Sequence, residues 1–106
     1  MRYYPIFVDL EGATVLIVGG SEEALRKARL IAKTPARIHV VADEVLPELK
    51  TLAARVSPRF DEALLDGVAL VYVAEPALGE RVSAAARARN IPVNVIDVAA
   101  QSTFLT

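Results

Sequence analysis

Short runs of apolar residues alternate along the chain with longer segments of mixed polarity. Two of these runs, at positions 14–18 and 68–74, are rich in β-branched residues and are bounded by Gly or Pro. Such runs predict strands that are buried on both faces, as in parallel sheets covered by helices. Two further strands are predicted at 37–42 and 92–96, and a short one within 4–12.

The segments between these runs repeat their apolar residues with a helical period. Over 22–33, Ala24, Leu25, Ala28, Ile31 and Ala32 fall on one face. Ser21 stands at the N-cap position, and the two glutamates that follow it suit the positive end of the helix dipole. Further helices are predicted over 46–55 and 77–89.

Strands that alternate with helices predict a parallel sheet built by right-handed crossovers. The fold class is therefore α/β, a Rossmann-type doubly wound parallel sheet. A length of 106 residues corresponds to a single small domain spanning residues 1–106.

Composition narrows the function classes. Hydrophobic residues make up 54% of the chain, charged residues 24%, and the net charge is −1, which leaves no electrostatic drive toward nucleic acid or an anionic membrane. The N-terminus lacks a signal-peptide pattern, and no apolar run approaches the roughly 20 residues that span a bilayer. We therefore expect a soluble, cytoplasmic protein with neither a nucleic-acid nor a membrane partner.

The chain offers little for metal binding. It has no cysteine, and its one histidine, His39, falls inside a predicted strand without partner ligands at metal-site spacing. We expect His39 to be structural and the chain to hold no resident metal.

The segment "VGGS" joins the first long strand to the first helix and invites comparison with the dinucleotide fingerprint. Gly19 takes the first glycine position, and Ser21 takes the second, where its hydroxyl can donate to a phosphate oxygen. Asp43 and Glu44 follow the second strand, where an acidic residue meets the ribose hydroxyls and favours NAD over NADP. Any α/β crossover also needs a glycine turn and a capped helix, so a purely structural loop is the alternative.

Longer stretches carry a family resemblance. The run "YPIFVDLEGATVLIVGGSEEALRKARL", followed by "LLDGVALVYVA", "RVSAAARARNIPVNVID" and "STFLT", resembles the N-terminal module of siroheme synthase, the precorrin-2 dehydrogenase and sirohydrochlorin ferrochelatase family. The similarity covers essentially the whole chain in order and spacing. It implies an enzyme that oxidises precorrin-2 to sirohydrochlorin with NAD and then inserts Fe²⁺ to give siroheme.

The resemblance also implies site residues. The cofactor-binding set comprises Gly19, Gly20, Ser21, Glu22, Glu23, Asp43 and Glu44. The catalytic carboxylate is the aspartate that closes "NVID", Asp97, which accepts protons in both steps. Taken without the family, Asp97 is a carboxylate that ends a strand and caps the next turn.

Two segments depart from the family pattern. Ser21 replaces a third consecutive glycine, Ala74, Glu75 and Pro76 stand where Thr followed by Asp or Asn is usual, and Gly79 stands near a common Asn. These departures keep open a second hypothesis, a non-catalytic nucleotide-binding or regulatory module derived from the same family. The resemblance further implies a dimerisation region and a helical domain beyond Thr106, and a homodimer in the longer form.

Overall fold

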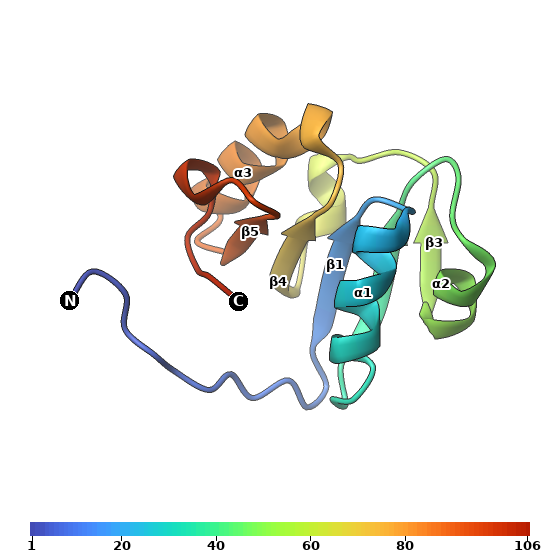
Figure 1. Cartoon of the computed structure of the whole chain (residues 1–106), viewed down its shortest axis with the longest axis horizontal. Helices are drawn as coiled ribbons and strands as arrows, with labels where there is room; N and C mark the ends of the chain where they lie inside the picture. Colours follow the sequence, from blue (N-terminus) through green and yellow to red (C-terminus); the bar gives the residue numbers. More distant parts are fainter.

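The computed structural model describes residues 1–106 and contains one sheet of five parallel strands in the order β3-β2-β1-β4-β5 (Figure 1). The strands are β1 Thr14–Val18, β2 Arg37–Val41, β3 Arg55–Ser57, β4 Val68–Val73 and β5 Val93–Val95. The α-helices are α1 Glu22–Ile31, α2 Pro47–Leu52 and α3 Gly79–Ala88. Short 3₁₀ helices cover Glu62–Leu65, Pro76–Leu78 and Ala99–Gln101.

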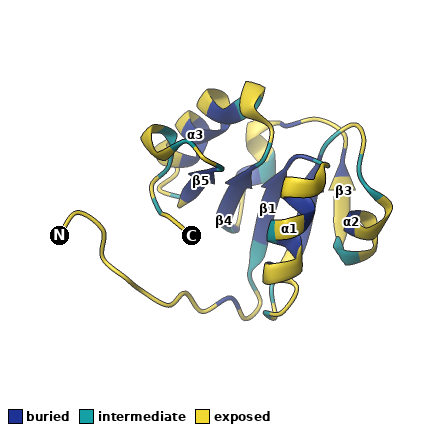
Figure 2. Ribbon diagram, viewed as in Figure 1, coloured by how far each residue is buried: buried dark blue, intermediate teal, exposed yellow.

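The central strand β1 divides the core into two layers. Leu16 and Val18 pack in the cluster that contains α3, whereas Val15 and Ile17 pack in the cluster that contains α1 and α2. All four side chains are fully buried, which explains why the run is apolar without alternation (Figure 2). Helices on both faces of an all-parallel sheet confirm the predicted Rossmann-type doubly wound fold of a single small domain.

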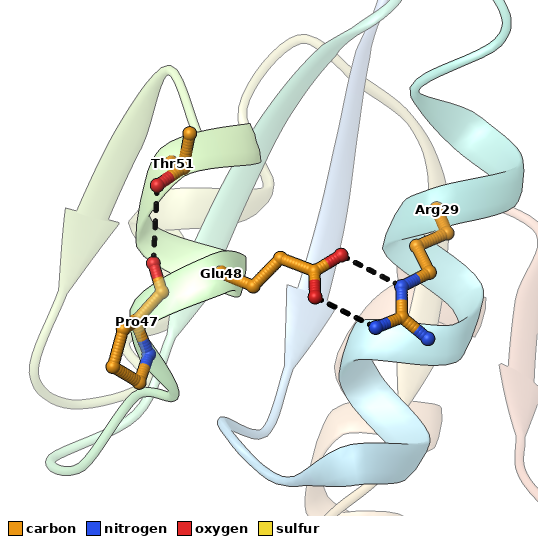
Figure 3. A network of polar contacts seen from close by, with 4 residues as sticks. All are labelled: Arg29, Pro47, Glu48 and Thr51. Carbon is orange, nitrogen blue, oxygen red and sulfur yellow. Dashed lines mark hydrogen bonds and ion pairs between the residues drawn. The ribbon is translucent and has the colours of Figure 1, made fainter.

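Helices α1 and α2 lie side by side on one face. The guanidinium of Arg29 donates from Nε and from a terminal nitrogen to the two carboxylate oxygens of Glu48, both at 2.7 Å (Figure 3). This hydrogen-bonded contact lowers the pKa of the Glu48 carboxyl from its ordinary value. None of the helices reaches the length and apolar character that crossing a bilayer requires.

The strand predicted within 4–12 is absent. Leu10 is buried and residues 11–12 form a turn, whereas the residues before them have no secondary structure and extend away from the body as an arm, with Tyr4, Ile6 and Phe7 exposed by 80%, 68% and 106% (Figures 1 and 2). Apolar character alone does not make a strand, because a strand needs a neighbour that takes its backbone hydrogen bonds.

The fifth strand of the sheet is instead β3, which the apolar pattern did not predict. Helix α2 ends at Leu52, earlier than expected, and β3 follows after two residues. β3 pairs with β2, with Val56 beside Val40. Its three residues are too few to show a periodic pattern.

The free edge of β5 is covered by the C-terminal segment. The backbone N–H of Thr103 donates to the carbonyl oxygen of Val93 at 2.7 Å, and the hydroxyl of Thr103 accepts from the N–H of Val93 at 2.9 Å. The hydroxyl of Ser102 accepts from the N–H of Val95 at 2.9 Å. The segment "STFLT" therefore satisfies an edge that would otherwise offer unpaired groups.

Candidate functional site

The carboxyl ends of β1, β2, β3 and β4 surround a cleft of about 1030 Å³. The connections after β1 and β4 lead to helices on opposite faces of the sheet, which is where doubly wound folds bind their ligands. Of the predicted cofactor-binding residues, the structure brings five to the lining of this cleft: Gly19, Gly20, Ser21, Asp43 and Glu44.

The two glycines allow the loop after β1 to pack against neighbouring backbone. Gly19 has a φ of +135°, a conformation that L side chains rarely adopt. A Cβ on Gly20 would clash with the carbonyl oxygen of Glu44. Leu46 donates its N–H to the carbonyl oxygen of Gly20 at 3.0 Å, so the loops after β1 and β2 form one wall of the cleft.

This wall ends in a row of free donors. The backbone N–H groups of residues 20–24 donate to no protein acceptor, and the hydroxyl of Ser21 makes no capping hydrogen bond to α1. Unpaired N–H groups at a helix N-terminus are a binding site for phosphate groups. Together with a cleft of dinucleotide size, they fit the pyrophosphate of NAD.

The acidic residues lie in two places. Asp43 and Glu44 line the cleft directly after β2, and Glu75, one of the departures from the family pattern, lines it after β4. Glu22 and Glu23 lie exposed in the first turn of α1 and are not among the lining residues. Asp43, Glu44 and Glu75 therefore form an acidic rim of the cleft, beside its free N–H donors.

The predicted catalytic residue Asp97 lies at a second, smaller cavity of about 360 Å³. It is exposed in the turn after β5 with a φ of 64°, and Lys27 and Asn94 line the same cavity. The turn follows a parallel strand, so Asp97 lies at the same edge of the sheet as the cleft without lining it.

The lining residues that the sequence did not assign to the cleft include Arg59, Phe60 and Arg81. Arg59 and Phe60 follow β3, and recognition of that strand would have pointed to them, because residues after parallel strands gather at one edge. The guanidinium carbon of Arg81 lies 5.3 Å from the centroid of the Phe60 ring.

His39 lies outside the cleft, in the interior of β2. Its Nε2 is 2.8 Å from the hydroxyl oxygen of Ser57, and both residues are buried. Burial lowers the pKa of His39 from its ordinary value, and the nearby charge of Arg55 adds to this effect. This contact joins β2 to β3 and gives His39 a structural role.

A parallel sheet with its cleft at the switch point, a glycine turn and unpaired N–H donors define a dinucleotide-binding domain of the Rossmann type. Residues 6–106 match the family described as "Putative NAD(P)-binding", and the chain belongs to this family.

The relatives refine this assignment. The chain is 47% identical to the siroheme synthase of Ectopseudomonas mendocina (strain ymp) over 106 residues, which is 94% of this chain and 23% of that protein. It is 46% identical to the siroheme synthase of Pseudomonas entomophila (strain L48), over 99% of this chain and 24% of that protein. The solved structure of SirC, precorrin-2 dehydrogenase, is similar with a TM-score of 0.73 and 26% identity, over 97% of this chain and 54% of that one.

These comparisons confirm the resemblance to siroheme synthase and support NAD as the cofactor. The chain spans about a quarter of the length of the siroheme synthases that it matches and about half of the dehydrogenase.

Proposed function

We propose that this chain is the NAD-binding module of an oxidoreductase that converts precorrin-2 to sirohydrochlorin in siroheme biosynthesis. The observation that carries the proposal is the row of unpaired N–H groups at residues 20–24, whose first two residues, Gly20 and Ser21, line a dinucleotide-sized cleft. Similarity to siroheme synthases and to a precorrin-2 dehydrogenase supplies the substrate class.

In this proposal different cofactor-binding residues bind different parts of the dinucleotide. The turn at Gly19, Gly20 and Ser21 receives the pyrophosphate, with the N–H groups of Glu22 and Glu23 as further donors. The carboxylates of Asp43 and Glu44 accept hydrogen bonds from the ribose hydroxyls, which would exclude a 2′-phosphate by charge repulsion. Bound NAD⁺ would supply the hydride acceptor.

Asp97 is the proposed proton acceptor. Oxidation of precorrin-2 removes two hydrogens, one as hydride and one as a proton, and a carboxylate at the sheet edge can take the proton. If Fe²⁺ is the second substrate, its insertion displaces two N–H protons from sirohydrochlorin, and the same carboxylate can receive them in turn. This second step makes the family's ferrochelatase (lyase) activity part of the proposal.

Calorimetric titration with NAD⁺ tests the cofactor site, and an Asp97→Asn variant of the longer protein tests the catalytic role. We expect the variant to lose dehydrogenation while its affinity for NAD⁺ stays nearly unchanged, because Asp97 does not line the cleft. Asp66→Asn, an exposed carboxyl after a 3₁₀ helix, is the matched control. Full activity in Asp97→Asn would refute the role.

A second candidate is a non-catalytic nucleotide-binding or regulatory module of the same descent. The separation of Asp97 from the dinucleotide cleft and the acidic Glu75 at the rim favour it. A longer form that binds NAD⁺ and precorrin-2 without producing NADH would select this candidate.

We also propose that this module acts within a longer protein, a cytoplasmic homodimer whose further regions complete the tetrapyrrole cleft. The relatives are about four times as long as this chain, which leaves room for a dimerisation region and a helical domain. On this basis the 106-residue chain alone would turn over precorrin-2 poorly, and comparison with the longer form tests this.

A further inference from the structure

The acidic rim creates an electrostatic problem for an anionic cofactor. Asp43, Glu44 and Glu75 line the cleft that would receive a pyrophosphate carrying two negative charges. Like charges at close range disfavour binding unless a cation offsets them. The cleft is lined by two cationic side chains, Arg59 and Arg81.

Arg81 is held in place by an aromatic ring. Its guanidinium carbon lies 5.3 Å from the centroid of Phe60, and a terminal nitrogen is 3.5 Å from the Phe60 carbonyl oxygen. Phe60 is 6% exposed, so the ring on which the guanidinium rests is fixed in the core. A stacked guanidinium retains free N–H groups along its edge.

The helix that carries Arg81 is also tightly seated. A Cβ on Gly79, the first residue of α3, would lie 2.4 Å from Oε1 of Gln101 and 3.1 Å from Cγ1 of Val95. The absence of a side chain therefore lets α3 begin close against β5 and the C-terminal segment. Arg81 follows two residues later and enters the cleft from a rigid element.

The guanidinium of Arg81 forms no ion pair within the protein. No carboxylate oxygen lies within 4.0 Å of its guanidinium, whereas Arg29 and Arg89 both have acidic partners. Arg59 is also free of ion pairs, and both arginines are exposed, but only Arg81 has a hydrogen bond and an aromatic contact that orient it.

We propose that Arg81 binds the pyrophosphate of the dinucleotide, from the side of the cleft opposite to the free N–H groups of α1. This inference rests on the proposed function and names a further cofactor-binding residue. The planar fork of a guanidinium can donate to two phosphate oxygens at once. The positive charge of Arg81 would offset the repulsion between the acidic rim and the pyrophosphate. It would also compensate for binding lost because Ser21 stands in place of a glycine.

The test is calorimetric titration of the chain with NAD⁺, ADP and adenosine at low salt. Arg81→Gln removes the charge and keeps most of the length, and Arg26→Gln removes the same charge from the exposed face of α1 as a control. We expect Arg81→Gln to lower the affinity for NAD⁺ and for ADP about tenfold or more, because a charge-assisted hydrogen bond is lost. Adenosine should bind equally to both proteins, and Arg81→Lys should recover part of the loss.

Other outcomes overturn the inference. If Arg81→Gln lowered the affinity for adenosine as much as that for NAD⁺, Arg81 would contact the adenosine part of the ligand instead of the pyrophosphate. If Arg81→Gln left the affinity for NAD⁺ unchanged, Arg81 would be a packing residue only. A loss in Arg59→Gln as large as that in Arg81→Gln would show a diffuse charge effect. Failure of the wild-type chain to bind NAD⁺ overturns the proposed function as well, whereas the first three outcomes leave it standing.

Discussion

Gly20 shows how one residue can serve a neighbouring loop as well as a ligand. The fingerprint explains glycines at a strand-to-helix turn by the approach of a pyrophosphate. Here the first group that a side chain on Gly20 would meet is the carbonyl group of Glu44, and the Cα of Val45 follows at 3.0 Å. Both belong to the backbone, which yields less readily than the end of a side chain.

Replacement of Gly20 by alanine should therefore destabilise the fold itself. We expect the free energy of unfolding to fall by about 3 kcal/mol, at the upper end of the usual cost of overpacking. Gly67→Ala is the control, since its φ of +75° is strained but nothing lies within 4 Å of the added methyl. That control should cost roughly 1 kcal/mol, and equal losses in urea unfolding would contradict the steric explanation.

His39 should make the stability depend on pH. Its pKa is lowered in the folded protein, so the unfolded chain takes up the proton first, near pH 6.5. The contribution of the neutral ring is complete above this pH and declines as the pH falls from about 6.5 toward the folded pKa, by at most about 1.4 kcal/mol per pH unit.

Urea unfolding between pH 7.5 and 5.5 measures this decline. A His39→Gln variant, whose amide can form a hydrogen bond with Ser57, should show a flatter profile over the same range. Parallel profiles for the two proteins would assign the pH dependence to other groups.

The candidate site could be predicted to the extent that it follows recognisable strands. Gly19, Gly20 and Ser21 after β1, and Asp43 and Glu44 after β2, share one cleft because parallel strands end at a common edge. Their binding roles, and that of Asp97, remain predictions. Arg81 could not be found this way, since its place in the cleft depends on the docking of α3 and the ring of Phe60.

At the scale of elements, the buried strands were predictable and the edges were not. β1 matches its predicted range, β2 and β4 are one residue shorter at the C-terminal end, and β5 is one residue shorter at each end. A buried strand can be recognised in the sequence because the residues on both of its faces are apolar, whereas two of the three residues of β3 are exposed. The hydrogen bonds that seal β5 come from hydroxyls nearby in sequence but outside any periodic pattern.

Loss of one such hydroxyl should be measurable. Ser102→Ala leaves the N–H of Val95 without its partner, and we expect a loss of about 1–2 kcal/mol in the free energy of unfolding. Ser21→Ala is a suitable comparison because that hydroxyl makes no cap to α1, and it should change stability by less than about 0.5 kcal/mol. A larger effect at Ser21 would show a cap that the structure lacks.

At the scale of the whole molecule, the body and the N-terminal arm contribute unequally to the stability of the fold. Residues 1–8 are exposed and form no hydrogen bond with the body, although they include aromatic and aliphatic side chains. Their removal should leave the free energy of unfolding within about 0.5 kcal/mol of the full chain. A larger loss in urea unfolding would show that the arm packs on the body in solution.

The order of the strands carries a consequence for how the domain acquires its structure. β1 is the first strand in the chain but the middle of the sheet, and its neighbour β4 begins 50 residues after β1 ends. Closing such a large loop costs entropy before the contact repays it, so the pairing of β1 with β4 should come late and limit the rate of folding. During synthesis the central strand β1 would therefore stay unpaired on one side until more than half of the chain has followed it.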